Sequence, residues 1–471
     1  MSNKILKNWS YLLISDVTQQ LIGFLVVILL ARKLSVDDYG FFNVILSAGM
    51  IFSVFAQFGM SNVVTREISI NPETTSSFIK KILIPFRLIS FLFSLLIFFG
   101  YNFYQGDYGN STIYIVLIIL NLSLWNFSES IAFGHEITKY SSILNILFSL
   151  CWLVSVLIIP EKALNVSTIL LVYCILHGLK GLSYGIVIYN IFYTKQQYKS
   201  KPTRISITHF LKMILPYFWL VLLGVLSLEI PIQLLNKNGN NIEVAYYVVG
   251  YKLMLPISIA VSTAFKAMFP MFTKLYSTNR NKFESKLKIG FKLIFILGTI
   301  LAIISSITSK HFIPLIFGSE YINSTIVFNF LIWFSIISIL DTLLSNGLSS
   351  AFKEKIIALL TTIDILILLP LLYIASFYGA WGIGLAKLIS GLLFLGYHLY
   401  VFKRALRINI LSKSLLICLF FYLTSMLVCL LINNVYIQIS ILIIIITIFT
   451  SIRNSPVNDT YRLFKELKIK N

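Results

Sequence analysis

The sequence predicts an all-α integral membrane protein with about fourteen transmembrane helices. Of its 471 residues, 58% are hydrophobic and only 12% are charged, and the mean hydropathy is +0.87. A soluble globular protein carries about 25% charged residues, so this chain has too few charges to cover a water-facing surface. Most of the chain lies in apolar runs of the length that crosses a bilayer as a helix, about 20 residues. A large soluble catalytic domain is therefore excluded.

Apolar runs bounded by polar residues, Gly or Pro are the expected spans. Twelve of them form two groups of six, at residues 10–31, 42–65, 82–101, 111–133, 142–160 and 167–193, and then 211–235, 244–270, 289–309, 326–349, 356–376 and 379–402. A final pair covers residues 414–432 and 436–452. The expected organisation is a six-helix bundle over 1–205, a second six-helix bundle over 206–410, and two extra helices with a basic tail over 411–471.

The distribution of lysine and arginine predicts the side of the membrane that each loop faces. Of the 38 basic residues, the termini and the loops on their side hold 29, and the loops on the other side hold five. Basic residues concentrate in cytoplasmic loops, so both termini are expected in the cytoplasm. If one span had been missed or wrongly added, every later loop would be assigned to the opposite side, and the basic residues would no longer be concentrated on one side. The asymmetry thus supports the span count independently of hydropathy.

Several functional classes are excluded by where the polar residues lie. The net charge of +20 does not indicate nucleic-acid binding, because the charges lie between apolar runs. The first run lacks the small-residue cleavage site of a signal peptide and is expected to be a span. The cysteines lie within apolar runs, without the close spacing of metal sites or disulfide frameworks. They are Cys151, Cys174, Cys418 and Cys429. No catalytic residue, metal or cofactor is expected.

The two groups of six spans show a weak internal duplication. Tyr39 and Tyr246 follow the first span of each group, and Lys180 and Lys387 lie in the last span of each group. Both pairs are separated by 207 residues. A repeat of this kind favours two parallel-oriented halves, an organisation found in secondary transporters whose substrate site lies between the halves near the midplane.

Charged side chains inside the spans are the candidate transport site, because each costs about 3 kcal/mol at the bilayer centre and therefore faces an interior. The basic ones are Lys180, Lys252, Lys266 and Lys387, and the acidic ones are Asp16, Glu129, Glu229, Asp341 and Asp364. Amides accompany them: Gln19 and Gln20 in the first span, and Asn43 and Gln57 on one stripe of the second. They predict a wet, partly cationic lumen between spans one, two, seven and eight.

Structural explanations stand beside the functional ones. Asp364 and Lys387, in adjacent spans, form an obvious structural ion pair. His177 is explained by a hydrogen-bonded packing role as well as by proton relay, and Gly178, Gly181 and Gly185 by close helix packing. The acids Asp37 and Asp38 suit a helix N-cap better than a metal or diphosphate site.

Five segments resemble the polysaccharide repeat-unit flippases, including O-antigen and capsule flippases, of the multidrug/oligosaccharidyl-lipid/polysaccharide exporter superfamily. They are "LARKLSVDDYGFFNVILS", "FGMSNVVTREIS", "VVGYKL", "IPLIFGSEY" and "FYGAWGIGLAKLIS". The chain departs from the family pattern at Glu229 and Pro231, where an aspartate in a more regular helix is expected. The final pair of spans is similar to the extra helices of lipid II flippases, which shape a groove for the lipid tail.

The resemblance implies a flippase that moves an undecaprenyl-diphosphate-linked oligosaccharide across the bacterial cytoplasmic (inner) membrane for surface polysaccharide assembly, such as O-antigen of lipopolysaccharide or capsule. Membrane lipids, a polysaccharide polymerase and a chain-length regulator are the expected partners. For the diphosphate we expect Arg66, Lys252 and Lys266, with Lys180 and Lys387 deeper in the two halves. For the sugars we expect Gln19, Gln20, Asn43 and Gln57. For coupling to protons or sodium we expect Asp16, Glu229 and Asp364.

Two other functions compete with this interpretation. A multidrug or cation antiporter of the same fold would need a cavity dominated by acids and aromatic rings, and the excess of deep lysines argues against it. A membrane-embedded polymerase or glycosyltransferase would need a large external loop with catalytic groups. The longest loop expected outside, residues 310–325, is too short for that.

Overall fold

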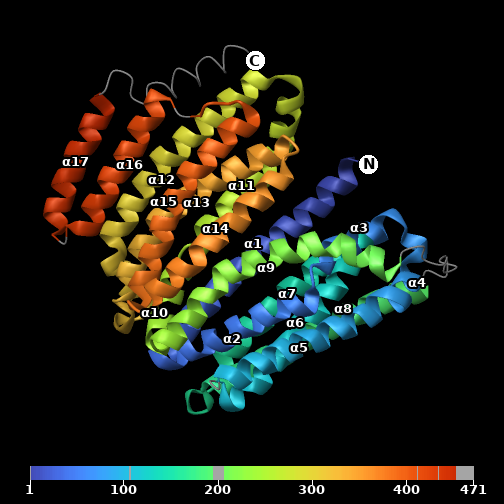
Figure 1. The fold of residues 1–471 in the computed structure, drawn as a ribbon. Helices are drawn as coiled ribbons and strands as arrows, with labels where there is room; N and C mark the ends of the chain where they lie inside the picture. The colour runs from blue at the N-terminus through green and yellow to red at the C-terminus, as the bar shows by residue number, and fades with distance from the viewer. Residues whose placement is uncertain (1, 106–107, 195–205, 411, 433, 452–471) are drawn as a thin grey trace. The chain divides into compact units, whose positions relative to one another are not determined.

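The computed structural model describes residues 2–105, 108–194, 206–410, 412–432 and 434–451, and every regular element in these ranges is helical (Figure 1). Twelve of the described helices are long and apolar enough to cross a membrane, and the apolar helix at Val435–Phe449 is shorter. The chain is therefore a multi-pass all-α membrane protein, as predicted. The basic tail lies outside the described residues.

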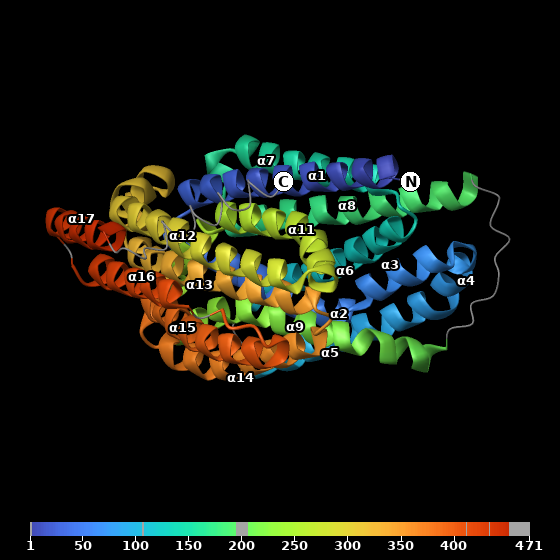
Figure 2. The same cartoon turned by 90° about the horizontal axis from the view of Figure 1, so that it is seen from above.

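The chain forms two compact units, Met1–Ala245 and Tyr246–Asn471. The first unit contains α1 (Ser2–Lys33), α2 (Val36–Gln57), α3 (Met60–Ile70), η1 (Pro72–Thr74), α4 (Thr75–Phe78), the π-helical turn η2 (Ile79–Leu83), α5 (Ile84–Gln105), η3 (Gly109–Ser111), α6 (Thr112–Gly134), α7 (Thr138–Ile158), η4 (Glu161–Ala163), α8 (Val166–Thr194) and α9 (Ile207–Asn238). Within it, α1 lies beside α7 (Figures 1 and 2), α6 packs against α8, and α2 packs against α5, α6 and α9.

The second unit follows the division, which falls inside α10 (Asn241–Lys252). Its remaining helices are α11 (Leu255–Thr278), α12 (Arg280–Phe317), η5 (Ser319–Tyr321), α13 (Ser324–Ser350), α14 (Glu354–Ser376), α15 (Gly379–Leu406), α16 (Lys413–Leu431) and α17 (Val435–Ser451). Helix α13 packs against α12 and α15, and α16 packs against α12 and α17. The Tyr422 hydroxyl donates to the buried carbonyl of Trp333 at 2.8 Å, which ties α16 to α13.

Two of the predicted spans are broken in the structure. The second ends as a helix at Gln57, because Phe58 and Gly59 both adopt left-handed backbone conformations before α3 begins. A β-carbon at Gly59 would lie 2.3 Å from the backbone nitrogen of Phe218 on α9, so only glycine fits there. The eighth predicted span is divided into α10 and α11. Pro256, in the first turn of α11, has no N–H to continue the hydrogen bonds of α10.

The N-cap of α2 is Ser35, and the acidic pair predicted to cap the helix lies in its first turn instead. The Ser35 hydroxyl accepts the backbone N–H of Asp38 at 3.1 Å. Asp37 accepts a hydrogen bond from the Asn241 amide at 3.2 Å. Both acids lie in the first helical turn, where carboxylates complement the helix dipole.

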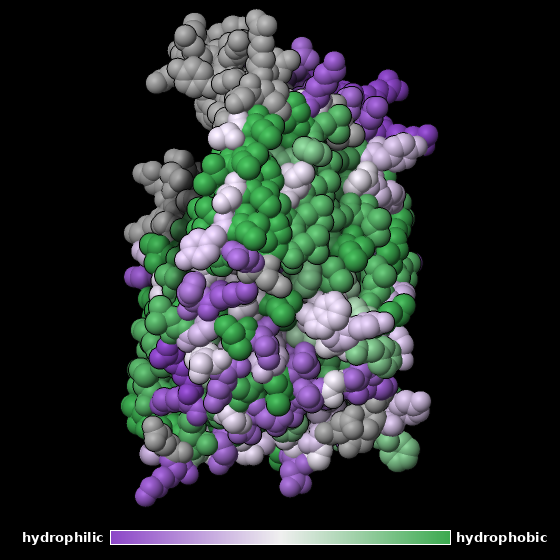
Figure 3. All heavy atoms as spheres, turned by 90° about the vertical axis from the view of Figure 1, so that its left-hand side faces the viewer, coloured by the Kyte–Doolittle hydropathy of each residue, from purple (hydrophilic) through white to green (hydrophobic). Residues whose placement is uncertain are grey.

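Hydrophobic side chains cover much of the face drawn in Figure 3, and hydrophilic ones gather toward its ends. Large apolar side chains are exposed on the outer helices, among them Phe420 on α16 and Ile443 and Ile444 on α17. Exposed apolar surface of this extent suits contact with lipid rather than water. The cysteines are free, as predicted, and all except the half-buried Cys151 are buried.

Candidate functional site

The first unit contains a cavity of about 170 Å³ at the centre of its candidate site. Residues of α1, α6, α7 and α8 line it. They are Gln19, Ile22, Gly23, Trp125, Phe148, Ser149, Trp152, Tyr173, Leu176, His177 and Lys180. None of these described lining residues is acidic, and four of them are Trp, Tyr or Phe. The cavity thus combines one lysine with aromatic walls and two groups able to form neutral hydrogen bonds, Gln19 and Ser149.

Lys180 is the only lysine among these lining residues. Lys180 is 4% exposed, and its Nζ lies 3.4 Å from the centre of the Trp125 ring. The structure gives Lys180 no ion pair among the described residues, so the Trp125 ring face is its direct contact, and the Glu129 carboxylate acts on its charge from further away. A buried cation held in this way can still attract an anionic group.

The neighbouring residues of α8 have packing roles. The rings of His177 and Tyr173 stack at 3.9 Å, and His177 Nδ1 lies 3.0 Å from the Tyr173 carbonyl oxygen. This geometry favours the packing explanation of His177. A β-carbon at Gly178 would lie 3.3 Å from Oδ1 of Asn121 on α6. Gly178 therefore permits the close approach of α8 to α6, as the helix-packing interpretation expected.

A hydrogen-bonded carboxylate lies deeper in the same bundle. Glu129 on α6 accepts hydrogen bonds from the Asn145 amide at 3.0 Å and the Tyr184 hydroxyl at 3.2 Å. The hydroxyl also lies 3.2 Å from the Ser141 carbonyl. These contacts join α6, α7 and α8. The Glu129 carboxylate thus has neutral hydrogen-bond donors and also interacts electrostatically with the Lys180 ammonium, without forming an ion pair with it.

The structure brings Gln19 and Lys180 together and distributes the other predicted residues of the first unit elsewhere. Gln19 lines the cavity and donates to the Ser15 hydroxyl at 3.1 Å, whereas Asp16 and Gln20 are exposed. On α2, Asn43 and Gln57 donate within their own helix, to the Tyr39 carbonyl at 2.7 Å and the Ser53 hydroxyl at 3.3 Å.

Two further predicted residues lie away from the cavity lining. Arg66 on α3 is exposed and pairs with Glu67 at 3.2 Å. Glu229 on α9 is half-buried, and its carbonyl accepts the Ser47 hydroxyl at 3.0 Å, which joins α9 to α2.

Arg87 is a buried cation within the third predicted span, residues 82–101, and was not among the charged residues expected to face an interior. It lies on α5, is 8% exposed, and its guanidinium carbon is 4.9 Å from the centre of the Phe127 ring. Its Nε and one terminal nitrogen have no hydrogen-bond partner among the described residues. Apolar residues flank it in the sequence "IPFRLIS", and that flanking was the signal that it belongs to a span.

The second unit contains a cluster of three titratable residues. His398 on α15 contacts the Asp341 carboxylate through Nδ1, and its Nε2 lies 3.0 Å from Asp364 Oδ1. One ligand atom from each residue lies within 4.8 Å of the others, a spacing that could hold a small cation. Asp341 was predicted only as a charge inside a span, without a role, and His398 was not predicted as a site residue. Acids in the tenth and eleventh spans together with a histidine in the twelfth could have indicated the cluster.

Lys387 has a different partner from the one suggested by sequence. Asp364 contacts His398, and Lys387 Nζ instead lies 5.5 Å from the ring centres of Tyr247 and Tyr251 on α10. The proposed Asp364–Lys387 ion pair is therefore wrong, because the histidine occupies the carboxylate. Lys252 is half-buried at the end of α10. Lys266 lies on α11, and its side chain is outside the described part of the chain.

Comparisons with solved structures give the fold. The chain is similar to lipid II flippase MurJ in an inward closed conformation, with 17% identity, a TM-score of 0.63, and coverage of 93% of this chain and 97% of that one. It is equally similar in TM-score, 0.63, to an inward-facing multidrug resistance transporter of the MATE family of the MOP superfamily, with 15% identity and coverage of 83% and 95%. The MATE transporter VcmN of Vibrio cholerae follows at 15% identity, 86% and 96% coverage, and a TM-score of 0.54.

The sequence comparisons give the family. No curated protein matches the chain significantly. The family model described as "Polysaccharide biosynthesis protein" matches residues 5–276, more than half of the chain. The protein is therefore a membrane protein of the polysaccharide biosynthesis protein family, and its fold is similar to that of the MurJ and MATE structures.

Proposed function

We propose that the protein is a flippase that moves undecaprenyl-diphosphate-linked oligosaccharide repeat units from the cytoplasmic to the outer leaflet of the bacterial inner membrane. The product would feed assembly of O-antigen, of lipopolysaccharide more generally, or of capsule. The observation that carries the proposal is the cavity around Lys180, which joins a buried cation to aromatic walls without a lining carboxylate. Membership of a polysaccharide biosynthesis family fits the same cargo.

The chemistry of this cargo explains why such a cavity is useful. A diphosphate carries about two negative charges, and each unpaired sugar hydroxyl moved into hydrocarbon costs several kcal/mol. Lys180 supplies a positive charge that is not already neutralised by an ion pair. The faces of Trp125, Trp152 and Tyr173 offer apolar area for sugar rings, and Gln19 offers hydrogen bonds. The polyprenyl chain can remain in lipid while the polar head crosses.

The other predicted residues keep their proposed roles. Lys252 and Lys387 supply positive charge in the second unit, where Lys387 is held by tyrosine rings as Lys180 is held by tryptophan. We assign further diphosphate contacts to Arg66 and Lys266. Sugar contacts outside the cavity are assigned to Gln20, Asn43 and Gln57. No catalytic residue is assigned, because translocation breaks no covalent bond.

Coupling to an ion gradient is assigned to the cluster of Asp341, Asp364 and His398. Two carboxylates beside one histidine repel each other unless a cation or proton neutralises them. A bound sodium ion or proton would therefore change the electrostatic balance at the meeting point of α13, α14 and α15, which suits a coupling site. Asp16 and Glu229 are the further candidates for this role.

The expected orientation places both termini in the cytoplasm, so that the repeat unit is received on the side where 29 of the 38 basic residues lie. After release at the outer leaflet, a polysaccharide polymerase under a chain-length regulator would consume the units. A cation antiporter of the same fold is the second candidate, favoured by the Asp341–Asp364–His398 cluster. It would place positively charged cargo against buried lysines, which opposes it.

Deletion of the gene, followed by analysis of surface polysaccharide and lipid-linked intermediates, tests the proposal. Loss of the polysaccharide together with accumulation of unpolymerised repeat units on the cytoplasmic leaflet is expected, and a plasmid copy should reverse both. Normal polysaccharide, or intermediates that accumulate on the outer leaflet, would contradict it. Drug sensitivity without a polysaccharide defect would favour the antiporter.

A further inference from the structure

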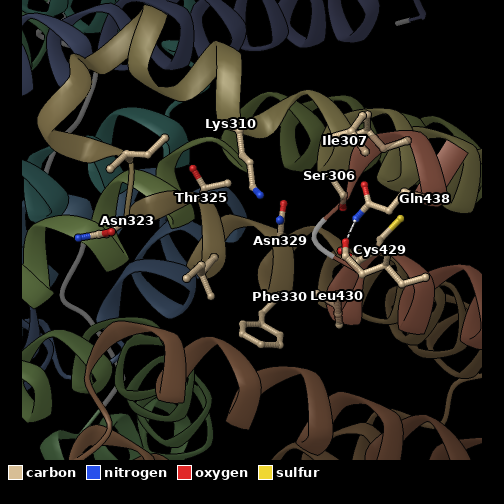
Figure 4. Close-up of a pocket in the computed structure, with 14 residues that line it drawn as sticks. Ser306, Ile307, Lys310, Asn323, Thr325, Asn329, Phe330, Cys429, Leu430 and Gln438 are labelled. Carbon is tan, nitrogen blue, oxygen red and sulfur yellow. Dashed lines mark hydrogen bonds between the residues drawn. The ribbon is translucent and has the colours of Figure 1, made fainter.

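A second cavity lies in the second unit, far along the chain from the Lys180 site. It has a volume of about 250 Å³ and is formed where α12 and the start of α13 meet the turn between α16 and α17 (Figure 4). The polar residues on which the argument depends are Ser306, Lys310, Thr325, Asn329 and Gln438. None of the described lining residues is acidic. The cavity therefore holds one cation and several neutral polar groups.

The cation is Lys310, near the end of α12. Figure 4 shows its side chain reaching into the space beside Thr325 and Asn329. The structure gives it no ion pair within the described ranges. Helix α13 begins at Ser324, so the positive end of its dipole lies beside Thr325. Lysine and a helix N-terminus together favour an anion.

The neutral groups that face this lysine have unused hydrogen-bonding capacity. Thr325 is 3% exposed, yet its hydroxyl has no partner among the described residues, and neither does the side-chain oxygen of Asn329. A buried hydroxyl without a partner is destabilising, so a ligand that engages it would recover that loss. The Ser306 hydroxyl accepts from Trp333 Nε1 at 3.1 Å and keeps its own hydrogen to donate.

The mouth of the cavity is held in place by Gln438 on α17. Its amide nitrogen donates to the carbonyl of Cys429 at 3.1 Å and to that of Ile432 at 2.5 Å, which fixes the turn between α16 and α17. Apolar side chains, including Ile322, Phe330 and Val435, form other parts of the wall. A polar base with a cation and apolar sides suits the head of an amphipathic molecule.

We propose that this cavity binds a phosphate-bearing anion through Lys310 and the Thr325 hydroxyl. The phosphate belongs to the headgroup of an anionic phospholipid or to a free ion, and the chemistry of recognition is the same in both cases. Lys310 is one of the five basic residues in loops expected outside, so the site would serve the outer side of the membrane. The proposal is independent of the transported substrate.

The test uses the purified full-length protein in a neutral detergent, with short-chain phosphatidylglycerol and inorganic phosphate as separate ligands and chloride at equal ionic strength as the blank. A ligand that binds the folded state raises the melting temperature. Phosphatidylglycerol, phosphate or both should raise it in the wild type. If only phosphatidylglycerol raises the melting temperature, the lipid headgroup is the source of the phosphate. If inorganic phosphate raises it at least as much as phosphatidylglycerol does, the free ion is the source.

Three variants establish whether the response comes from this cavity. Lys310→Ala should weaken the apparent affinity by about tenfold or more, the effect of losing one charge-assisted hydrogen bond, and Lys310→Arg should retain most of it. Lys162→Ala removes the same charge from an exposed position in another loop expected outside, and should change nothing. Thr325→Val should reduce affinity without lowering the ligand-free melting temperature, because its hydroxyl has no partner to lose.

The proposal is overturned if neither ligand produces a response above the chloride blank. It is equally overturned if Lys310→Ala responds like the wild type, or if Lys162→Ala loses as much affinity as Lys310→Ala. A drop in the ligand-free melting temperature of Thr325→Val would also contradict it, since the hydroxyl would then have a structural partner.

Discussion

The ammonium nitrogen of Lys180 lies 3.4 Å from the centre of the Trp125 ring, and the Glu129 carboxylate, which acts on its charge without forming an ion pair, accepts hydrogen bonds from Asn145 and Tyr184. A cation–π contact in a desolvated site is worth about 2 kcal/mol, less than the attraction that a phosphate offers in the same surroundings. Lys180 can therefore exchange the ring for a phosphate oxygen, which an ion-paired lysine would do less readily.

Replacing Lys180 with Met separates a transport role from a packing role. Met has a similar length and is apolar, so the buried helix should fold and insert. We expect export of polysaccharide to fall by at least about tenfold, because the charge–phosphate contact is lost. The measurement is surface polysaccharide in a deletion strain, at a membrane level of protein matched by immunoblot. Lys180→Arg should restore part of the export. If Lys180→Met exports as much polysaccharide as the wild type, Lys180 is not part of the transport site.

The hydroxyl of Tyr184 should contribute to stability through Glu129. Tyr184→Phe leaves the Glu129 carboxylate with the Asn145 amide and removes the hydroxyl that lies 3.2 Å from Glu129, from the Ser141 carbonyl and from Asn145 Oδ1. The expected loss is about 1–3 kcal/mol, the cost of a buried hydrogen bond to a charged group. Thermal denaturation in detergent measures it. Tyr140→Phe is the control, since Tyr140 is an exposed residue on the neighbouring helix α7. An equal effect in both variants would show that the Glu129 contact is not responsible.

Coupling should depend on His398 and the two aspartates that contact it. His398→Asn keeps a polar group on α15 but removes one ring nitrogen from the cluster. We expect transport driven by a proton or sodium gradient to fall, while binding of the lipid-linked substrate changes little. Uptake into vesicles with an imposed gradient gives the first quantity, and substrate protection against heating gives the second. If His398→Asn loses substrate binding as well as gradient-driven transport, His398 belongs to the substrate site instead.

The sharp turn between α2 and α3 should tolerate no side chain at Gly59. Gly59→Ala places a β-carbon 2.3 Å from the Phe218 nitrogen, with a backbone φ of 67°. We expect a large fall in melting temperature or in the amount of inserted protein, since strain and a clash act together. Gly224→Ala on α9 meets nothing within 4 Å and is the matched control. Alanine is a better helix former there, so the control should be neutral or stabilising.

Most of the fold could be predicted because hydropathy and basic residues are strong signals over long segments. The breaks could not be predicted in the same way. The end of α2 depends on the approach of α9 to Gly59, and the approach of two distant helices cannot be read from local sequence. The break before α11 was accessible in principle, because Pro256 removes a helix donor. It was hidden by the apolar residues on both sides, which read as one span.

The candidate site was predictable at the level of residue type. Intramembrane charges are costly and so mark interiors, and this argument selected Lys180 and Asp364. It could not choose their partners, because partners come from other helices. The ring beside Lys180 is Trp125 and the group beside Asp364 is His398. Arg87 was not selected, although it lies within a predicted span and α5 buries it.

The most direct test is movement of a fluorescent undecaprenyl-diphosphate oligosaccharide in liposomes that contain the purified protein and an imposed proton or sodium gradient. A membrane-impermeant quencher reports the fraction of label on the outer leaflet over time. The account predicts transfer between leaflets that is faster than in protein-free liposomes and slowed about tenfold or more by Lys180→Met. Transfer by the wild type no faster than in protein-free liposomes would contradict it.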